Sequence, residues 1–307
     1  MVDVAVLGGG PAGATAAARL AAGGFAVVLV DPLGIGGALI NVDHLPDHPD
    51  HPDGVAGWDL AAALGENALA AGATVTMGRA GTPTWADGTW TVPVDGGRDE
   101  VRARAVLVAT GCRPRPLPGD VDGSLEGRGV SYCAVCDGGL FAGRTVVVVG
   151  DGPVAFAEAR TLAEMAAAVT VVVAGPEPAA DPSWVEAALA AGRVEVLTGQ
   201  PVTTVRVAED GTGVTGVETA AGTVIAAGGV FGALDPVPNS EPVSGLVDLE
   251  SDGRIPVDDV FAVLSAPPGL FAAGDVRQGA GARAAAAAAD GERAATAVAS
   301  FLGQPFF

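Results

Sequence analysis

The sequence contains no lysine, and all 16 of its basic side chains are arginines. Without a lysine amine, Schiff-base catalysis by a protein side chain is excluded. The formal net charge is −20, so the chain would repel the phosphates of a nucleic acid rather than neutralise them. No run of eighteen apolar residues is free of glycine or charge, so we expect no membrane span. Neither a nucleic acid nor a membrane is therefore an expected partner.

Cysteine is also scarce, with only Cys112, Cys133 and Cys136. The N-terminus enters a strand-like pattern at Val2 without a basic stretch and an apolar segment, so we expect no secretory signal and a cytoplasmic location. Three cysteines in such a chain do not make a structural disulfide framework. Cys133 and Cys136 can instead close a small disulfide ring that stores two electrons. A tetrahedral zinc site would need two further ligands, so we predict a redox pair and no metal.

A glycine-rich βαβ pattern opens the chain. An apolar strand over 2–7 leads into Gly8-Gly9-Gly10-Pro11-Ala12-Gly13, a helix to about Ala22 and a strand over 25–30 that ends at Asp31. In such a unit Gly8 allows the tight turn, Gly10 lets backbone approach a pyrophosphate, and Gly13 lets the helix pack on the strand. The helix N-terminus attracts phosphates, and Asp31 is expected to accept hydrogen bonds from a ribose. The pattern predicts a dinucleotide site.

The pattern recurs later in the chain. A strand over 146–149 is followed by a turn with Gly150, Gly152 and Ala155, a helix over 156 to about 167 and a strand over 169–173. The position equivalent to Asp31 falls in the run 174–176, which holds no acid for a ribose diol. No arginine lies between Arg160 and Arg193 to bind a 2′-phosphate. We therefore predict a degenerate second nucleotide site at Gly150, Gly152 and Ala155, with the phosphate turn but without the adenosine anchors.

Proline-rich stretches at 112–118 and 235–239 flank this second unit and are typical of interdomain crossings. We expect an α/β protein with two Rossmann-like nucleotide-binding domains of the three-layer ββα type, the second inserted in the first. The first domain would be discontinuous, with residues 1–115 and 237–307. The inserted domain would be residues 116–236 and would carry the Cys-x-x-Cys motif. A Gly-Asp turn after a strand near 269–273 and a helix from about 281 to 302 would complete the first domain.

Several signatures together resemble the low-molecular-weight thioredoxin reductase family, FAD-dependent pyridine nucleotide-disulfide oxidoreductases of class II. They are the run from Gly8 to Gly13, the run Ala109-Thr110-Gly111, the segment 127–138 that ends in Cys133-Ala134-Val135-Cys136-Asp137-Gly138, and the run from Phe271 to Val276. The resemblance covers both domains. It implies FAD in the first domain and a homodimer. It also implies a swivel at the two crossings, which turns the dithiol alternately toward the flavin and toward a protein substrate.

The resemblance also implies roles for individual residues. Cys136 would be the flavin-proximal sulfur that forms a transient adduct with the isoalloxazine, and Cys133 would attack the external disulfide. Asp137 would be the general acid/base, because only the thiolate is nucleophilic and an adjacent carboxylate can carry its proton. The residues expected to bind FAD are Gly8, Gly10, Pro11, Ala12, Gly13, Asp31 (adenosine ribose), Gly37, Leu39, Asp47, Thr110, Gly111, Gly274, Asp275 (ribityl chain), Arg283 and Ala284.

The chain departs from the NADPH-using members at the second nucleotide site. In those members the second strand leads into a His-Arg-Arg stretch that holds the 2′-phosphate. Here the aligned residues are Ala174-Gly175-Pro176, and the following Glu177 and Asp181 would repel a phosphate. NADPH is therefore doubtful as the reductant, and ferredoxin or another donor is an alternative.

Other departures lie near the expected flavin. Asp47 replaces an asparagine of the family and His48 an aromatic ring, so His48 is a candidate base or, more simply, part of a solvated acidic loop. A metal site made of His44, His48 and His51 fits by ligand type, but the intervening prolines oppose it. Arg283 aligns with a position that contacts the flavin and would stabilise its anionic reduced form. Cys112 follows Gly111 and is expected to fill space.

Three functional hypotheses follow. The first is an FAD-dependent disulfide reductase that acts on thioredoxin or a thioredoxin-like protein, with a donor other than tightly bound NADPH. The second is a dithiol oxidase that closes a disulfide in a small molecule and passes the electrons to dioxygen, although such oxidases usually carry His-Gly after the second cysteine. The third is a redox-inactive flavin-binding protein, and ordinary NADPH-dependent reductase activity is a further alternative.

Overall fold

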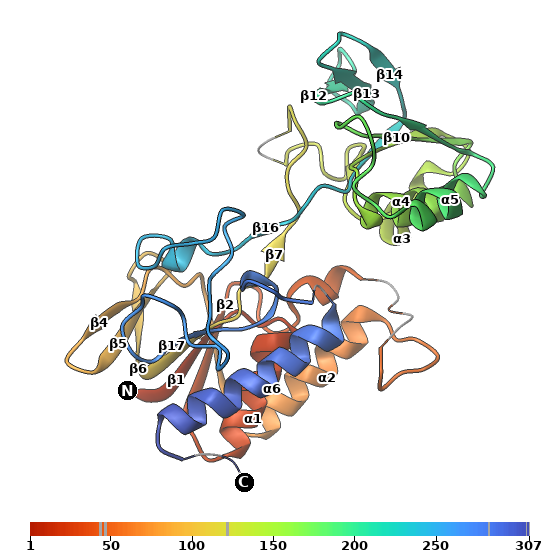
Figure 1. Cartoon of the computed structure of the whole chain (residues 1–307). Coiled ribbons are helices and arrows are strands. Elements are labelled where there is room, and N and C mark those ends of the chain that lie inside the picture. The colour runs from red at the N-terminus through yellow and green to blue at the C-terminus, as the bar shows by residue number, and fades with distance from the viewer. Residues whose placement is uncertain (43–44, 46–47, 121–122, 282, 305, 307) are drawn as a thin grey trace. The chain divides into compact units, whose positions relative to one another are not determined.

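The computed structural model describes residues 1–42, 45, 48–120, 123–281, 283–304 and 306, which form two compact units (Figure 1). The first unit combines Met1–Arg113 with Val237–Phe307, and the second is Pro114–Pro236. The chain leaves the first unit after β7 (Cys112–Arg113) and re-enters it at β16 (Val237–Pro238). These short strands pair antiparallel, so the outgoing and returning segments are joined to each other.

A seven-stranded sheet forms the centre of the first unit. Its strands are β1 (Val2–Leu7), β2 (Val27–Asp31), β3 (Thr74–Met77), β4 (Thr84–Ala86), β5 (Thr89–Val94), β6 (Asp99–Val108) and β17 (Leu270–Ala272). The order is β3-β2-β1-β6-β5-β4, with β17 also paired to β6. β1, β2, β3, β6 and β17 are parallel, whereas β4 and β5 add an antiparallel extension.

Helices α1 (Pro11–Ala22), α2 (Gly57–Ala70) and α6 (Ala284–Phe301) pack side by side in the first unit (Figure 1). α1 and α6 are rich in alanine, and small side chains let helices and sheet approach closely. The opposite face of the sheet has its own core around Trp90, which is fully buried and donates from Nε1 to the Pro268 carbonyl at 3.0 Å. Short 3₁₀ turns are η1 (Gly37–Asn41), η3 (Glu241–Val243) and η4 (Gly274–Val276).

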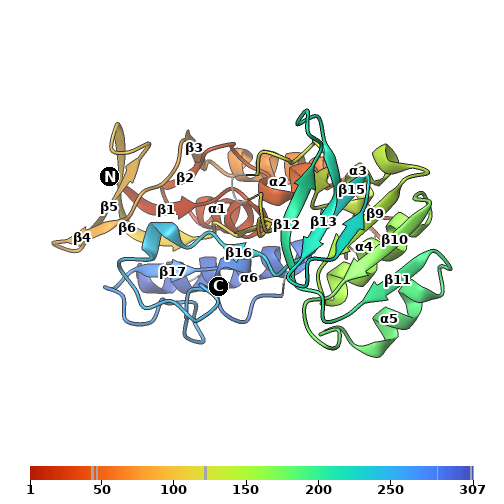
Figure 2. The same cartoon turned by 90° about the horizontal axis from the view of Figure 1, so that it is seen from above.

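The second unit contains a five-stranded parallel sheet of order β11-β10-β9-β15-β8 and a three-stranded antiparallel sheet of order β12-β13-β14 (Figure 2). The parallel strands are β8 (Val130–Ser131), β9 (Thr145–Val149), β10 (Ala168–Val172), β11 (Val194–Leu197) and β15 (Gly229–Gly232). The antiparallel strands are β12 (Val202–Val207), β13 (Val214–Thr219) and β14 (Val224–Ala226). The helices are α3 (Ala134–Asp137), α4 (Pro153–Ala163) and α5 (Pro182–Leu189), with the 3₁₀ turn η2 (Gly138–Phe141).

The alternation of side chains along β9 explains the three layers of this unit. Val146 and Val148 pack with Phe156 of α4, whereas Val147 and Val149 pack with Val217 of the antiparallel sheet. Because successive side chains of a strand point to opposite faces, one parallel sheet is covered by helices on one side and by strands on the other. The predicted fold class, α/β with two Rossmann-like units of which the second is inserted in the first, is confirmed.

The element boundaries differ in places from the sequence predictions. β2 starts at Val27 instead of Phe25, because the Phe25 amide bonds back to the Leu20 carbonyl and closes the end of α1. α4 ends at Ala163 instead of about Ala167, because the Met165 carbonyl accepts from the Gly143 amide and the Ala167 amide bonds to the Arg144 carbonyl, which leads the chain into β10. α6 starts at Ala284 instead of about Gly281. Within the described part of the chain, no helix has both the length and the hydropathy needed to cross a membrane.

Candidate functional site

The first glycine turn, between β1 and α1, has the tight geometry that a dinucleotide site requires. Gly8 adopts φ +106°, and a Cβ there would lie 2.4 Å from the Ala109 carbonyl oxygen. A Cβ on Gly13 would lie 1.9 Å from the Gly8 carbonyl oxygen. Gly10 caps α1 without a side-chain hydrogen bond, Pro11 follows it, and α1 has no acid in its first turn. The first-turn amides of α1 therefore face an open position suited to a phosphate.

Asp31, at the end of β2, is tied to this turn. Its Oδ2 accepts a hydrogen bond from the Gly9 amide at 2.8 Å, and its Oδ1 accepts one from the Leu33 amide at 2.8 Å. An ionised carboxylate has about four acceptor sites on its two oxygens. Asp31 therefore keeps acceptor capacity for ribose hydroxyls, and its predicted role toward adenosine stays a prediction.

A cavity of about 320 Å³ lies where the N-termini of α1 and α6 meet in the first unit. It brings together the predicted flavin-binding residues Pro11, Leu39, Asp275, Arg283 and Ala284. The remaining lining residues are Ala38, Val42, Leu45, His48, Ala285 and Ala287. Apolar walls with a few polar groups are typical of cofactor sites. α6, like α1, has no side-chain cap and no acid in its first turn, so this cradle suits a group that carries both phosphate and a flat apolar ring.

Other predicted flavin-binding residues lie outside the cavity lining. Thr110 donates from Oγ1 to the Asn239 carbonyl at 2.6 Å, and Asn239 donates from Nδ2 to the Thr110 carbonyl at 2.9 Å. The Asn239 amide also bonds to the Gly111 carbonyl at 2.9 Å. Thr110 and Gly111 therefore join the outgoing and returning segments of the chain. Asp47 lies outside the described residues.

A buried ion pair, which the sequence analysis missed, supports the turn that carries Asp275. Arg277 donates to both carboxylate oxygens of Asp290, from Nε at 2.6 Å and from Nη2 at 2.7 Å. Asp290 also accepts a hydrogen bond from the Gly274 amide at 3.2 Å. The Arg277 and Asp290 side chains are only 13% and 8% exposed. An acid within the alanine-rich stretch of α6 was the available sequence signal, but its partner is not local.

Cys112 is an unreactive thiol beside the same turn. Its Sγ donates to the Asp275 carbonyl at 3.2 Å. Burial, and next the nearby Asp275 carboxylate, raise the pKa of the Cys112 thiol to about 11. Because the thiolate is the reactive form, this supports a structural rather than a chemical part for Cys112.

The histidine segment forms no metal centre among the residues described. The backbones of His48 and His51 pair antiparallel, and their ring centroids are 5.3 Å apart. The Asp50 amide donates to His48 Nδ1 at 3.3 Å. His44 lies outside the described residues, and within them no group of three His, Cys, Asp or Glu side chains is placed to hold a metal ion.

The redox pair belongs to the second unit. Cys133 and Cys136 form a disulfide with an S–S distance of 2.09 Å and a Cα–Cα distance of 5.4 Å. Cys133 caps α3, and its Sγ accepts a hydrogen bond from the Cys136 amide at 3.1 Å. Cys136 is exposed and Cys133 is half-buried. The short α3 turn thus presents the disulfide at the end of β8.

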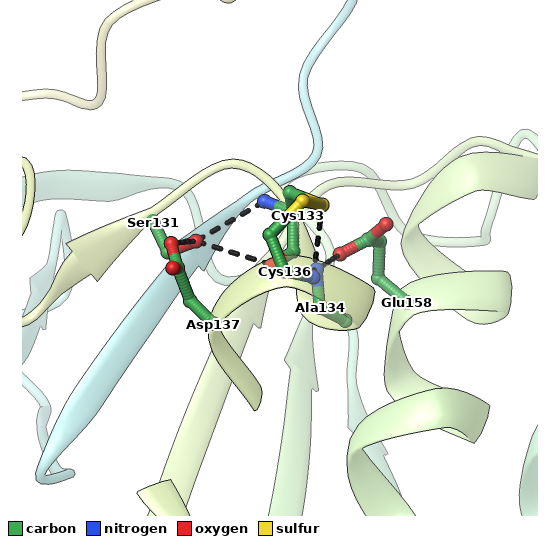
Figure 3. The surroundings of a disulfide bond; sticks show 6 residues. All are labelled: Ser131, Cys133, Ala134, Cys136, Asp137 and Glu158. Atoms are coloured by element: carbon green, nitrogen blue, oxygen red, sulfur yellow. Dashed lines mark hydrogen bonds between the residues drawn. A yellow bond between two sulfur atoms is a disulfide. The ribbon is translucent and has the colours of Figure 1, made fainter. Parts of the chain in front are cut away.

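Two side chains hold this motif from opposite sides (Figure 3). Ser131 Oγ accepts from the Cys133 amide at 3.1 Å and donates to Asp137 Oδ2 at 2.6 Å. Glu158 reaches from α4 and accepts from the Ala134 amide. Burial raises the pKa of the Glu158 carboxyl, and the hydrogen bond from Ala134 opposes this effect. Sequence reasoning found Asp137 but assigned no role to Ser131 or Glu158.

The second glycine turn is also formed, with a different electrostatic environment. A Cβ on Gly150 would lie 2.3 Å from the Ala233 carbonyl oxygen, whereas Gly152 caps α4 and meets no atom within 4 Å. The Ala180 amide bonds to the Asp151 carbonyl at 2.9 Å, which places the loop after β10 beside this turn. Asp151, Glu177 and Asp181 are exposed in these two segments. The backbone turn is suited to phosphate, but the side chains around it are acidic.

Comparison with known proteins agrees with this arrangement. The sequence profile described as pyridine nucleotide-disulphide oxidoreductase matches residues 2–291, and the chain belongs to this family. It is similar to the thioredoxin reductase of Mycolicibacterium smegmatis, with 33% identity over 276 residues, 89% of this chain and 88% of that protein. It is 31% identical to the thioredoxin reductase of Bacillus subtilis (strain 168) over 303 residues, 98% of this chain and 94% of that protein.

Solved structures give the same result. The structure of Lactococcus lactis thioredoxin reductase in its FR conformation covers 99% of both chains, with a TM-score of 0.85 and 27% identity. That of T. acidophilum thioredoxin reductase covers 97% of this chain and 98% of that chain, with a TM-score of 0.82 and 27% identity. The chain is a thioredoxin reductase-like flavin oxidoreductase, an enzyme with a Cys-x-x-Cys disulfide, and its family implies FAD. The predicted family is confirmed.

Proposed function

We propose that the protein exchanges electrons between FAD and an external dithiol or disulfide through Cys133 and Cys136, with a physiological electron donor other than tightly bound NADPH. The observation that carries this proposal is the Cys133–Cys136 disulfide with Asp137 held beside it by Ser131. A disulfide that closes a four-residue turn can open and re-form without unfolding the unit around it.

In this proposal the first unit binds FAD, and the second unit is a domain similar to a nucleotide-binding domain that carries the redox pair. FAD would be held by the glycine turn at Gly8, Gly10 and Gly13, by Asp31 at the ribose, and by the cavity that Asp275 and Arg283 line. The set of predicted FAD-binding residues is completed by Pro11, Ala12, Gly37, Leu39, Asp47, Thr110, Gly111, Gly274 and Ala284. When bound, FAD supplies a carrier that accepts and releases two electrons. Arg283 would place a positive charge beside it.

The exchange of electrons with the external disulfide can be written with residues of this chain and a proton from water. The Cys133 thiolate attacks one sulfur of the external disulfide, and the other sulfur leaves as a thiolate. Asp137, which has taken the proton of Cys136, returns it to the leaving sulfur. The Cys136 thiolate then attacks the Cys133 sulfur of the mixed disulfide and displaces the partner's second sulfur, which takes up a proton from water. The protein ends as the disulfide and the partner as the dithiol. Ser131 keeps the Asp137 carboxylate at the motif throughout.

The acidic side chains around the second glycine turn support a donor other than NADPH. A 2′-phosphate would meet Asp151, Glu177 and Asp181 instead of arginines. The amide and the hydroxyl of Ser183 both donate to Asp181 and lower the pKa of its carboxyl, which keeps the charge negative. Like charges at such a site oppose binding, and Gly150, Gly152 and Ala155 would then retain only the phosphate turn.

The test is flavin reduction under argon with NADPH, NADH and a small dithiol, each followed by stopped-flow absorbance. Slow bleaching by NADPH, fast bleaching by a dithiol, and recolouring on addition of oxidised thioredoxin are expected. Cys133→Ser should abolish the recolouring. Fast bleaching at micromolar NADPH would show that the protein is an ordinary NADPH-dependent thioredoxin reductase. Absence of recolouring with every thioredoxin-like protein would remove the disulfide-reductase proposal.

A cavity beside the flavin-binding residues favours a second candidate function, oxidation of a small-molecule dithiol by dioxygen. This cavity measures about 440 Å³, and it shares Pro11, His48, Ala284 and Ala285 with the first one. His51 and Asn67 also line it, so an imidazole base is available to a small ligand there. Hydrogen peroxide formed in step with dithiol consumption would support this function, and a reduced flavin that is stable in air would rule it out.

Thioredoxin or a thioredoxin-like protein is the proposed protein partner, as the names of the relatives suggest, and a small-molecule dithiol is the alternative. Ferredoxin is a further candidate donor, although the net charge of −20 disfavours an acidic protein. We further propose a homodimer. Light scattering on the purified protein would show a single-chain mass if this is wrong.

A further inference from the structure

Glu158 is a charged side chain that bonds to the backbone of the redox motif from another element. It lies on α4, and its Oε2 accepts from the Ala134 amide, the first peptide group after Cys133. Three further hydrogen bonds of the motif are local: the Cys133 amide donates to Ser131 Oγ, the Cys136 amide to Cys133 Sγ and the Asp137 amide to the Cys133 carbonyl. Figure 3 shows Glu158 on the side of the cysteines opposite Ser131 and Asp137.

This carboxylate is partly removed from water. Glu158 is only partly exposed, on a helix whose neighbouring Phe156 and Ala159 are buried in the core of the unit. Burial raises the pKa of its carboxyl, as expected where the charged form loses hydration. A hydrogen bond from a neutral amide compensates part of this cost. A neutral side chain with an acceptor oxygen could also bond to the Ala134 amide. The negative charge of Glu158 is therefore not needed for this contact alone.

We propose that Glu158 is a positioning residue that sets the redox poise of the Cys133/Cys136 pair. It holds the α3 turn through Ala134 and places a negative charge beside the sulfurs. The inference rests on the proposed function, in which the pair cycles between disulfide and dithiol.

The sign of the effect follows from the balanced half-reaction. The disulfide takes up two electrons and two protons to give two thiols, and above the pKa of one thiol it takes up one proton and leaves a thiolate. A nearby carboxylate disfavours that thiolate and raises its pKa. Glu158 therefore favours the disulfide at alkaline pH, where a thiolate would otherwise stabilise the reduced form. Asp137 adds the same sign of charge from the other side and is unchanged in the variants below.

Glu158→Gln tests this proposal, because glutamine keeps the length and an acceptor oxygen for Ala134 but removes the charge. The matched control is Glu164→Gln, an exposed glutamate at the C-terminal end of the same helix. The full-length flavoprotein is equilibrated under argon with glutathione buffers at pH 8.5, then quenched and alkylated. Peptide mapping separates the redox pair from Cys112.

Glu158→Gln should shift the equilibrium constant about tenfold toward the dithiol, equivalent to about 30 mV for a two-electron couple. The pH at which iodoacetamide alkylation reaches half its maximal rate should also fall, because removing the carboxylate charge lowers the thiol pKa. Glu164→Gln should match the unmodified protein, and Glu158→Asp, which keeps the charge, should stay closer to it than Glu158→Gln does. If the glutamine variant did not fold, the thiol pKa of the Glu158→Asp protein would be measured in its place.

A Glu158→Gln protein with an unchanged potential and thiol pKa, or with a shift toward the disulfide, would overturn the proposal and leave Glu158 a purely structural contact. This outcome is distinct from failure of the proposed function. The glutathione equilibrium requires no flavin turnover, whereas the proposed function fails only if flavin and dithiol do not exchange electrons.

Discussion

Replacing Arg277 by methionine should destabilise the first unit strongly, because the substitution leaves the Asp290 carboxylate buried with the Gly274 amide as its remaining described partner. The two side chains are 13% and 8% exposed and share two hydrogen bonds of 2.6 and 2.7 Å. Removing one member of such a buried pair costs about 3–5 kcal/mol. For a unit of this size that corresponds to a fall in Tm of about 10 °C.

The assay is thermal unfolding of the flavoprotein, followed by far-UV circular dichroism and by release of flavin fluorescence. Asp252→Ala is the matched control, because the Asp252–Arg254 pair lies in the same unit but Asp252 is 52% exposed. That control should lose about 1 kcal/mol or less. Flavin should also be released at lower temperature in Arg277→Met, since Asp290 supports the turn that carries Asp275.

A double variant, Arg277→Met with Asp290→Asn, separates charge burial from lost packing. It should recover a substantial part of the single-variant loss, because no uncompensated charge then remains. If Arg277→Met loses no more stability than the Asp252→Ala control, the reasoning from burial is refuted. If the double variant is less stable than Arg277→Met by the full cost of a second core lesion, the charge is not the cause.

Three further predictions concern the other groups. Asp137→Asn should slow exchange with an oxidised partner by about 10²–10⁴-fold while the disulfide still forms, and Glu209→Gln, an exposed carboxylate of the same unit, should not; equal rates in stopped-flow recolouring would count against Asp137 as the proton carrier. Cys112, whose pKa is raised by burial to about 11, should alkylate about 100-fold more slowly at pH 8 than an ordinary thiol. Because the pKa of Cys112 is higher in the folded than in the unfolded chain, the protonated thiol favours folding at low pH, and this contribution to stability is lost as pH rises from 9 through 11. Rapid labelling of Cys112 at pH 8 would contradict this. Gly8→Ala should abolish FAD retention, measured as the 450 to 280 nm absorbance ratio, because its Cβ would meet the Ala109 carbonyl oxygen at 2.4 Å; Gly24→Ala, also at positive φ but with no atom within 4 Å, should retain FAD and lose about 1 kcal/mol.

Much of the site was predictable where chemistry depends on local spacing. The two glycine turns, the proline after each and the Cys-x-x-Cys pair are recognisable because backbone conformation and ring closure involve neighbours in sequence. The cavity lining also includes five of the residues expected near the flavin, among them Asp275 and Arg283. The helix and strand ends were less predictable, because tertiary contacts decide where each element stops.

The sequence by itself determined the α/β class, the repeated nucleotide-binding pattern and the redox pair, since each depends on residue types at short separations. Only the tertiary structure showed that Asp290 holds Gly274 and Arg277, that Ser131 orients Asp137, and that Glu158 meets Ala134. Glu158 and Ala134 come from different elements, and the four residues of α3 carry too little sequence pattern to predict which side chains surround it. Such contacts depend on how helices pack on a sheet, and hydrophobic packing specifies that placement through many small, non-directional terms that no local pattern displays.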